Sequence, residues 1–119
     1  MKTIFTALTG LIVSAGVASA TNYPLVNTGE LTHSIYGRGI EIRVQPSPMP
    51  EDGIDGVSVS KALAGICAHY APLVIPHVEA ATGIENPAFV AVRVIEDSSL
   101  EHYRLKAFRL ARGTCGAPL

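Results

Sequence analysis

The side chains best suited to chemistry are the histidines, because imidazole changes charge near neutral pH and can serve as a base or a metal ligand. They lie in four separate segments, at His33, His69, His77 and His102. No two have the i, i+4 spacing that would aim both at one metal from a helix. His69 and His77 are therefore the candidates for a polar site if the protein is an enzyme, with Glu79 or Glu85 as the carboxylate partner.

Three short motifs resemble functional signatures but lack their context. Residues 58–61 have the Ser-x-x-Lys spacing of a lysine-activated serine, yet the accompanying Ser-Asp-Asn and Lys-Thr-Gly motifs are absent. Residues 37–39, Gly-Arg-Gly, lack the third glycine of a dinucleotide fingerprint and indicate a hairpin turn. The acidic loop at residues 51–56 lacks the spacing of a calcium-binding EF-hand. The sequence therefore predicts no cofactor and no metal.

Cys67 and Cys115 are the two cysteines of the chain, and they do not form a Cys-x-x-Cys motif. In an oxidising compartment, a pair so far apart in sequence is typical of a structural disulfide. Such a bond would stabilise the fold by about 4 kcal/mol in the chain-entropy model. A redox couple is the alternative, and it requires a sulfur that solvent can reach.

The N-terminus carries the signals of export. Lys2 precedes an apolar run that ends at Ala18-Ser19-Ala20, after which the sequence becomes polar. This pattern predicts a signal peptide at residues 1–20 and a single small exported domain at 21–119, periplasmic or secreted. No second hydrophobic span is expected to cross a membrane.

The overall charge excludes one class of partner. Lys and Arg number 9 against 10 Asp and Glu, which leaves a formal net charge of -1. Nucleic-acid binding favours a clear excess of basic residues, so no nucleic-acid partner is expected.

The periodicity of the apolar residues predicts two pairs of strands with a helix between them. Residues 31–36 and 40–45 alternate as a hairpin around the glycines at 37–39, and residues 89–96 form the strongest strand. A last strand, at about 103–111, slips in its alternation near Ala107 and Phe108, which suggests a bulge. We therefore expect an α+β two-layer sandwich, with an antiparallel sheet of about four strands (β-β-α-β-β) covered on one face by a helix.

The helix is expected to start near residue 57, where apolar residues begin to recur at intervals of three and four. This stripe includes Cys67, so its sulfur should point inward. Asp55, Ser58 or Ser60 is expected to cap the start, and Gly83 to end the helix in the left-handed conformation. Pro72 and Pro76 lie between these limits, so we expect a kinked or broken helix.

Basic residues gather on the predicted strands and suggest a binding surface. The candidates for anion or partner binding are Arg43, Arg93, Arg104 and Lys106. Guanidinium groups bind carboxylates and phosphates through paired hydrogen bonds. The alternative is internal cross-strand pairing, for example between Glu41 and Arg104.

These observations favour a noncatalytic module that binds a protein or an anionic envelope component through the open face of its sheet. This hypothesis predicts an exposed patch containing Arg43 and Arg93, and it fails if internal ion pairs consume both arginines. A small hydrolase or isomerase using a histidine on the helix is the first alternative, and it requires a pocket where histidine, carboxylate and nucleophile converge. A cysteine redox protein is the second.

Overall fold

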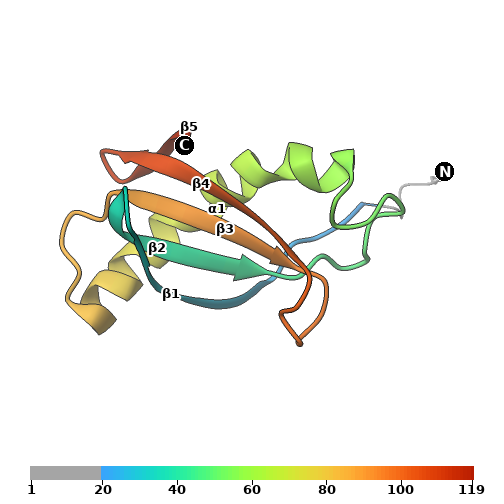
Figure 1. Ribbon diagram of the computed structural model, residues 1–119, viewed down its shortest axis with the longest axis horizontal. Coiled ribbons are helices and arrows are strands. Elements are labelled where there is room, and N and C mark those ends of the chain that lie inside the picture. Colours follow the sequence, from blue (N-terminus) through green and yellow to red (C-terminus); the bar gives the residue numbers. More distant parts are fainter. Residues whose placement is uncertain (1–19) are drawn as a thin grey trace, which may run out of the picture.

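The computed structural model describes residues 20–119, which form one sheet with one helix packed behind it in Figure 1. The elements are β1 (Leu25–His33), β2 (Gly37–Val44), α1 (Val57–Thr82), β3 (Phe89–Ile95), β4 (Tyr103–Ala111) and β5 (Thr114–Pro118). The predicted α+β sandwich is confirmed, with five strands in place of about four. The predicted signal peptide, except for its last residue, lies outside the described residues.

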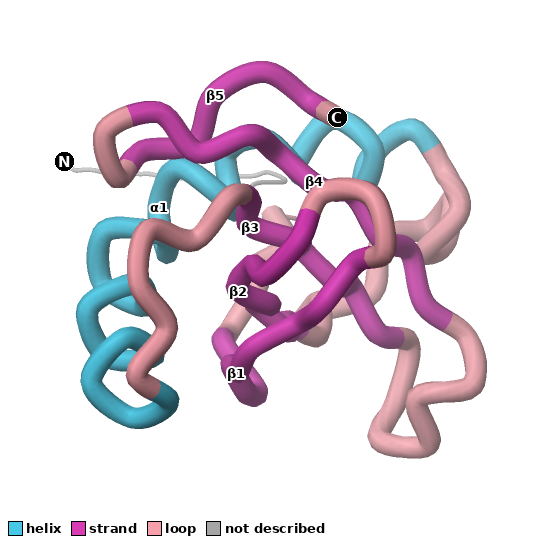
Figure 2. The backbone as a smooth tube through the Cα atoms, turned by 60° about the vertical axis from the view of Figure 1, so that its left-hand side comes forward, coloured by secondary structure: helices cyan, strands magenta, loops and turns pink. Residues whose placement is uncertain are grey.

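The strands lie in the order β1-β2-β3-β4-β5, and every neighbouring pair is antiparallel except β2 and β3, which are parallel. The expected antiparallel sheet is therefore corrected at this central pair. Parallel neighbours need a long crossover connection, and α1 provides it between them. Figure 2 shows the helix lying beside the twisted row of strands.

The core lies between α1 and the two central strands. From β2 and β3, alternate residues such as Ile42 and Val92 point toward the helix and are fully buried. The helix contributes the apolar stripe that its sequence predicts: Val59, Leu63, Ile66, Cys67, Ala71, Val74, Ile75 and Val78. The period of the sequence therefore identified the inner side of α1.

The start of α1 differs from its prediction. Its N-cap residue is Gly56, which has no side chain to form a capping hydrogen bond. The proposed caps Asp55, Ser58 and Ser60 are therefore wrong. Instead the carboxylate of Asp52 accepts a hydrogen bond from the Ser58 backbone N–H, at 3.0 Å. That bond lowers the pKa of Asp52. An acceptor from the preceding loop thus does the work of a side-chain cap.

The helix continues as one element through Pro72 and Pro76, so it is not broken. It ends at Gly83, as predicted, with φ of 76° and an N–H that donates to Glu79 O at 2.9 Å. By length and composition alone, this helix is long and apolar enough to cross a membrane. The stripe packed on the sheet accounts for much of that apolar composition.

The outer strands also differ from prediction. β1 begins at Leu25, and Gly37 and Gly39 belong to β2, so the hairpin turn is at residues 34–36. Gly37 has φ of 88°, a conformation that L side chains rarely adopt, which explains a glycine next to the turn. β5 was missed because it is short and contains glycine and proline, which are rare in strands. The irregularity expected in β4 lies between Phe108 and Leu110, opposite β5.

A disulfide joins Cys67 of α1 to Cys115 of β5, with 6.0 Å between the Cα atoms. The predicted pairing is confirmed. Cys67 is fully buried, so the bond ties the middle of the helix to the last strand inside the core.

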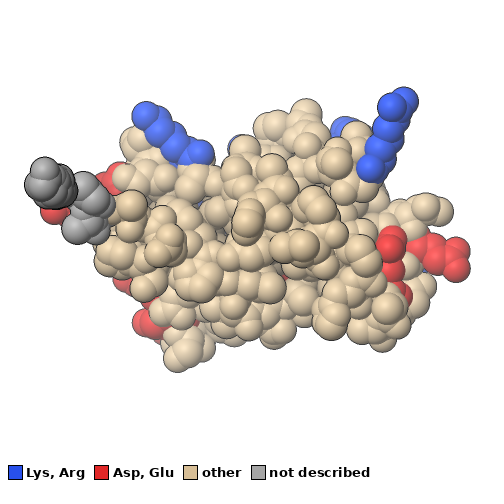
Figure 3. Space-filling view, turned by 180° about the vertical axis from the view of Figure 1, so that it is seen from behind, with Lys and Arg blue, Asp and Glu red and all other residues tan. Residues whose placement is uncertain are grey.

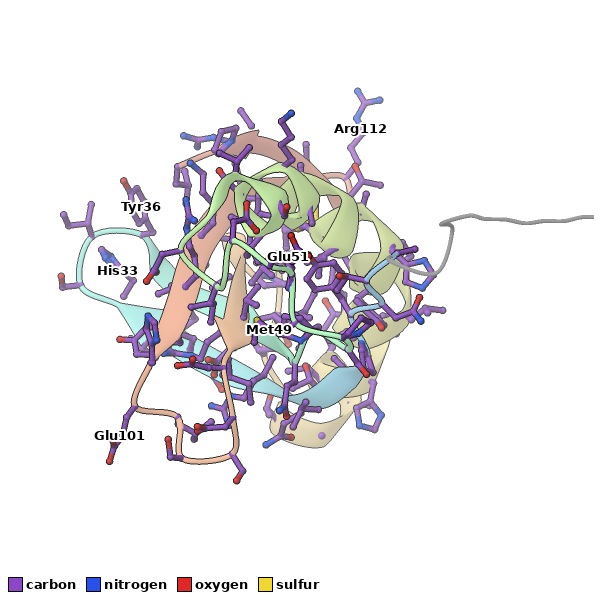
Figure 4. All side chains as sticks on the ribbon, turned by 90° about the vertical axis from the view of Figure 1, so that its right-hand side faces the viewer. His33, Tyr36, Met49, Glu51, Glu101 and Arg112 are labelled. Carbon is purple, nitrogen blue, oxygen red and sulfur yellow. A yellow bond between two sulfur atoms is a disulfide. The ribbon has the colours of Figure 1, made fainter. Side chains whose placement is uncertain are left out.

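On the face of the sheet away from α1, the side chain of Phe89 lies across Gly39. A Cβ at Gly39 would stand 2.5 Å from the ring of Phe89, which is only 2% exposed. His33 and Tyr36 complete this aromatic cluster, with ring centroids 4.8 Å apart. Figure 4 shows these two side chains on the β1–β2 hairpin. Gly39 is therefore required by close packing.

Replacing both Cys67 and Cys115 by alanine should lower the free energy of unfolding by about 4 kcal/mol, because the unfolded chain regains the freedom that the bond removes. Urea unfolding of the two proteins measures the difference. The wild-type protein unfolded in the presence of a reductant is the control. An unchanged midpoint in both cases would show that the bond does not stabilise the fold.

Gly39→Ala should destabilise the protein by roughly 1–3 kcal/mol, because the new methyl group would overlap the buried Phe89 ring. Gly65→Ala is the matched control, since a Cβ on that exposed helix position meets nothing within 4 Å. It should stabilise by about 0.5–1 kcal/mol through helix propensity. Equal urea midpoints for the two variants would contradict the packing of Phe89 on Gly39.

Candidate functional site

The sheet has a second face, opposite α1, formed by the odd-numbered residues of β1 from Asn27 onward and of β2, β3 and β4. The register keeps these positions together, since Asn27 pairs with Arg43, and Phe89 with Arg109. The even-numbered residues of β2 and β3 form the core under the helix. We refer to this surface as the second face.

An ion cluster of Glu41, Arg43 and Arg93 lies at the centre of the second face. Glu41 Oε1 is 3.4 Å from Arg43 Nη2, and Glu41 Oε2 contacts Arg93 Nε. The side chains are only 12%, 23% and 18% exposed, respectively. The parallel register places Arg43 directly beside Arg93, an arrangement of like charges that is destabilising without an anion between them.

The ion cluster carries a surplus of positive charge. One carboxylate faces two guanidinium groups, which leaves one positive charge among the three side chains. The guanidinium of Arg93 also lies 4.3 Å from the centre of the Tyr103 ring. Arg109 lies on the same face. The charged residues at the strand positions of the second face are therefore three arginines and one glutamate.

Arg104 and Lys106 do not join this cluster. Their register partners are valines of the core, which places both residues on the helix side of the sheet. Arg104 Nη1 donates to the Gly56 carbonyl at 3.1 Å, where it holds the loop before α1. The four basic residues predicted as a group are therefore divided between the two faces. The suggested Glu41–Arg104 pair is replaced by pairs from Glu41 to Arg43 and Arg93.

A small hollow of about 220 Å³ adjoins the ion cluster at β1. It is lined by Asn27, Thr28, Gly29, Glu41 and Arg43. The Nε of Arg43 is buried and has no hydrogen-bond partner in residues 20–119. A buried donor without an acceptor costs free energy and calls for an explanation. Sequence reasoning identified Arg43 but missed Gly29, because nothing local signals the hollow.

The histidines proposed for an enzyme do not meet a carboxylate. His69 lines a hollow of about 580 Å³ together with Tyr70, against whose ring it packs at 4.8 Å. Thr21 and Ser47 also line it, but none of its lining residues is Asp or Glu. His77 is exposed about two turns further along α1. The structure therefore does not bring together the groups that the hydrolase hypothesis requires.

Metal and redox chemistry have little support in the described residues. Within residues 20–119, no group of three His, Cys, Asp or Glu side chains could hold a metal ion. Cys67 is fully buried and its disulfide partner Cys115 is half-buried, whereas a catalytic sulfur must be accessible. Figure 3, which views the molecule from the side opposite to that of Figure 1, shows a surface with few charged side chains except at its edges.

His102 forms a charged contact that sequence reasoning missed. Its Nδ1 is 2.7 Å from Glu96 Oε1 and its Nε2 is 2.8 Å from Asp55 Oδ2. The bonds to Glu96 and then Asp55 raise the pKa of His102 above its ordinary value of 6.5. The β3–β4 loop is thereby tied to the loop before α1. Asp55 is 47 residues away in sequence, so no local pattern could reveal the pair.

The raised pKa of His102 gives the stability of the protein a predictable pH dependence. The folded state binds this proton more tightly than the unfolded chain, so the stabilisation is complete below the unfolded value of 6.5. It is lost as the pH rises through the folded pKa. His102→Asn should therefore lower the urea midpoint more at about pH 5.5 than at about pH 8. An NMR titration giving a pKa below 6.5 for His102 would contradict the contact.

No protein-family model, curated protein or solved structure was found to match this chain. The function of the second face must therefore be inferred from its geometry alone.

Proposed function

We propose that this chain is an exported, noncatalytic binding module whose second face binds an acidic segment of another protein. The observation that carries the proposal is the surplus positive charge of the ion cluster, on the sheet face that the helix leaves open. The predicted signal peptide supports export, and the disulfide is compatible with an oxidising compartment.

The partial burial of the ion cluster makes its charge effective. Its side chains are 12–23% exposed, so bulk water screens them less than it screens a charge on the surface. Their positions are already held by Glu41 and by the Tyr103 ring, so a ligand orders little on binding. Preorganised arginines are suited to bind a carboxylate.

Arg43 and Arg93 do not form the exposed patch that was expected, because both pair with Glu41 and are only 23% and 18% exposed. These ion pairs are the main argument against this function. These ion pairs do not use all the N–H donors of the two arginines. A guanidinium carries five N–H donors, and the two oxygens of Glu41 serve two guanidinium groups. Only Nη2 of Arg43 contacts Glu41, and the Arg43 side chain remains 23% exposed. A second carboxylate would neutralise the surplus charge without displacing Glu41.

Apolar surface beside the ion cluster favours a protein partner over a small anion. Tyr103 and Leu105 on the second face are 43% and 44% exposed. Tyrosine and arginine are enriched among the residues that dominate binding energy at protein interfaces. A partner that carries both a carboxylate and apolar side chains fits this surface best.

NMR titration with a blocked hexaglutamate peptide tests the proposed function on ¹⁵N-labelled protein from the exported fraction. Resonances of the second face, including Arg43 Nε–H, should shift, and Arg43→Gln should weaken binding roughly tenfold by removing a charge-assisted hydrogen bond. Lys106→Gln is the matched control on the helix side and should change the affinity less than about twofold.

Three outcomes would overturn the proposal. The first is equal weakening by Arg43→Gln and Lys106→Gln, and the second is a set of shifts confined to the helix side. The third is inorganic phosphate binding as tightly as the peptide, which would favour an anionic envelope component over a protein.

A further inference from the structure

Strand β1 forms an open edge of the sheet. It has 9 residues and pairs only with β2 in the part of the chain that the structure describes. An edge strand presents a row of unpaired backbone N–H and C=O groups to an incoming strand. β1 contains no proline, and Glu30 is its only Asp, Glu, Lys or Arg residue. The opposite edge, β5, has 5 residues and ends at Pro118, so it offers much less.

Gly29 leaves a gap between this edge and the ion cluster. It stands on the second face of β1, directly opposite Glu41 of β2. A Cβ built on Gly29 meets nothing within 4 Å, and the hollow above it is also lined by Arg43. The Arg43 side chain is 23% exposed, although its Nε is buried. A side chain entering from the outer side of β1 would find the space over Gly29 with the Arg43 guanidinium beside it.

We propose that an extended segment of a partner protein adds to β1 as a sixth strand and places an aspartate or glutamate side chain over Gly29, where it pairs with the guanidinium group of Arg43. Strands lie about 4.8 Å apart, so the added strand would run about 10 Å from β2. Arg43 is in register with Asn27 and Gly29 with Glu41, so a glutamate on the added strand and Arg43 would meet diagonally over the glycine. The inference rests on the proposed function and specifies how the partner enters.

The partner is a different chain and not a second copy of this one. The one carboxylate of β1, Glu30, has an even number and pairs with Arg38 on the helix side of the sheet. Two β1 strands paired antiparallel, which keeps both second faces on the same side, would therefore present no carboxylate there. Strand addition by another protein gains affinity from backbone hydrogen bonds and specificity from alternate side chains.

The test uses two blocked, threonine-rich peptides of nine residues, the length of β1, one with glutamate at its centre and the other with glutamine. The glutamate peptide should bind the wild-type protein roughly tenfold more tightly, because its bond to Arg43 is charge-assisted. Binding should also slow hydrogen exchange of the outward-facing backbone amides of β1. Equal affinities for the two peptides would overturn the carboxylate contact.

Gly29→Val fills the hollow without disturbing the fold. The position has room for a Cβ and does not have a left-handed φ, and valine favours strands. This variant should keep its urea midpoint and bind the glutamate peptide at least roughly tenfold more weakly. Gly65→Ala, on the exposed helix surface with equal room for a Cβ, is the matched control and should bind normally.

The variants separate failure of this inference from failure of the proposed function. If Arg43→Gln weakens binding of the glutamate peptide but Gly29→Val does not, the second face still binds acid and the route over β1 is wrong. If neither change weakens binding, both proposals are wrong. If sedimentation shows a wild-type dimer that Gly29→Val dissociates, the strand on β1 is a second copy and the inference is overturned.

Discussion

The parallel pairing of β2 with β3 is the constraint on which the rest of the structure depends. Parallel neighbours cannot be joined by a tight turn, so the chain between them must cross the sheet, and α1 is that crossing. The crossing covers one side of the central strands, and within residues 20–119 no helix lies on the other side. The disulfide then fixes the middle of α1 to β5 and stabilises the crossing from the far edge of the sheet.

The same pairing creates the ion cluster. Its register brings Arg43 beside Arg93. Glu41 lies two residues before Arg43, on the same face of β2, and contacts both arginines. A parallel register shifted by two residues would separate the two arginines. Arg104 and Lys106 belong to the other face for the same reason, because they pair with core valines of β3. The division of the basic residues therefore follows from pairing, which no single strand reveals.

Local patterns predicted what local physics determines. The buried stripe of α1, its end at Gly83 and the alternation of β3 depend on neighbouring residues, and all three were predicted correctly. The parallel pair, the short strand β5 and the bridge from His102 to Asp55 depend on contacts between distant segments. The start of α1 was mispredicted because Asp52 reaches Ser58 from outside the usual capping position. Of the second face, the arginines were anticipated but Gly29 and its hollow were not.

Two local costs coincide at that hollow, and the fold explains neither. A glycine within a strand loses more conformational freedom than other residues and packs no side chain. At Gly39 a glycine is required because the Phe89 ring leaves no room for a Cβ. Gly29 has neither a left-handed φ nor a close neighbour. A buried donor without an acceptor is also unfavourable, and Arg43 Nε is one beside that same glycine. Positions that break a local rule without structural compensation are expected at functional sites. A carboxylate entering over β1 would fill the space at Gly29 and pair with the Arg43 guanidinium, so binding there would account for the glycine.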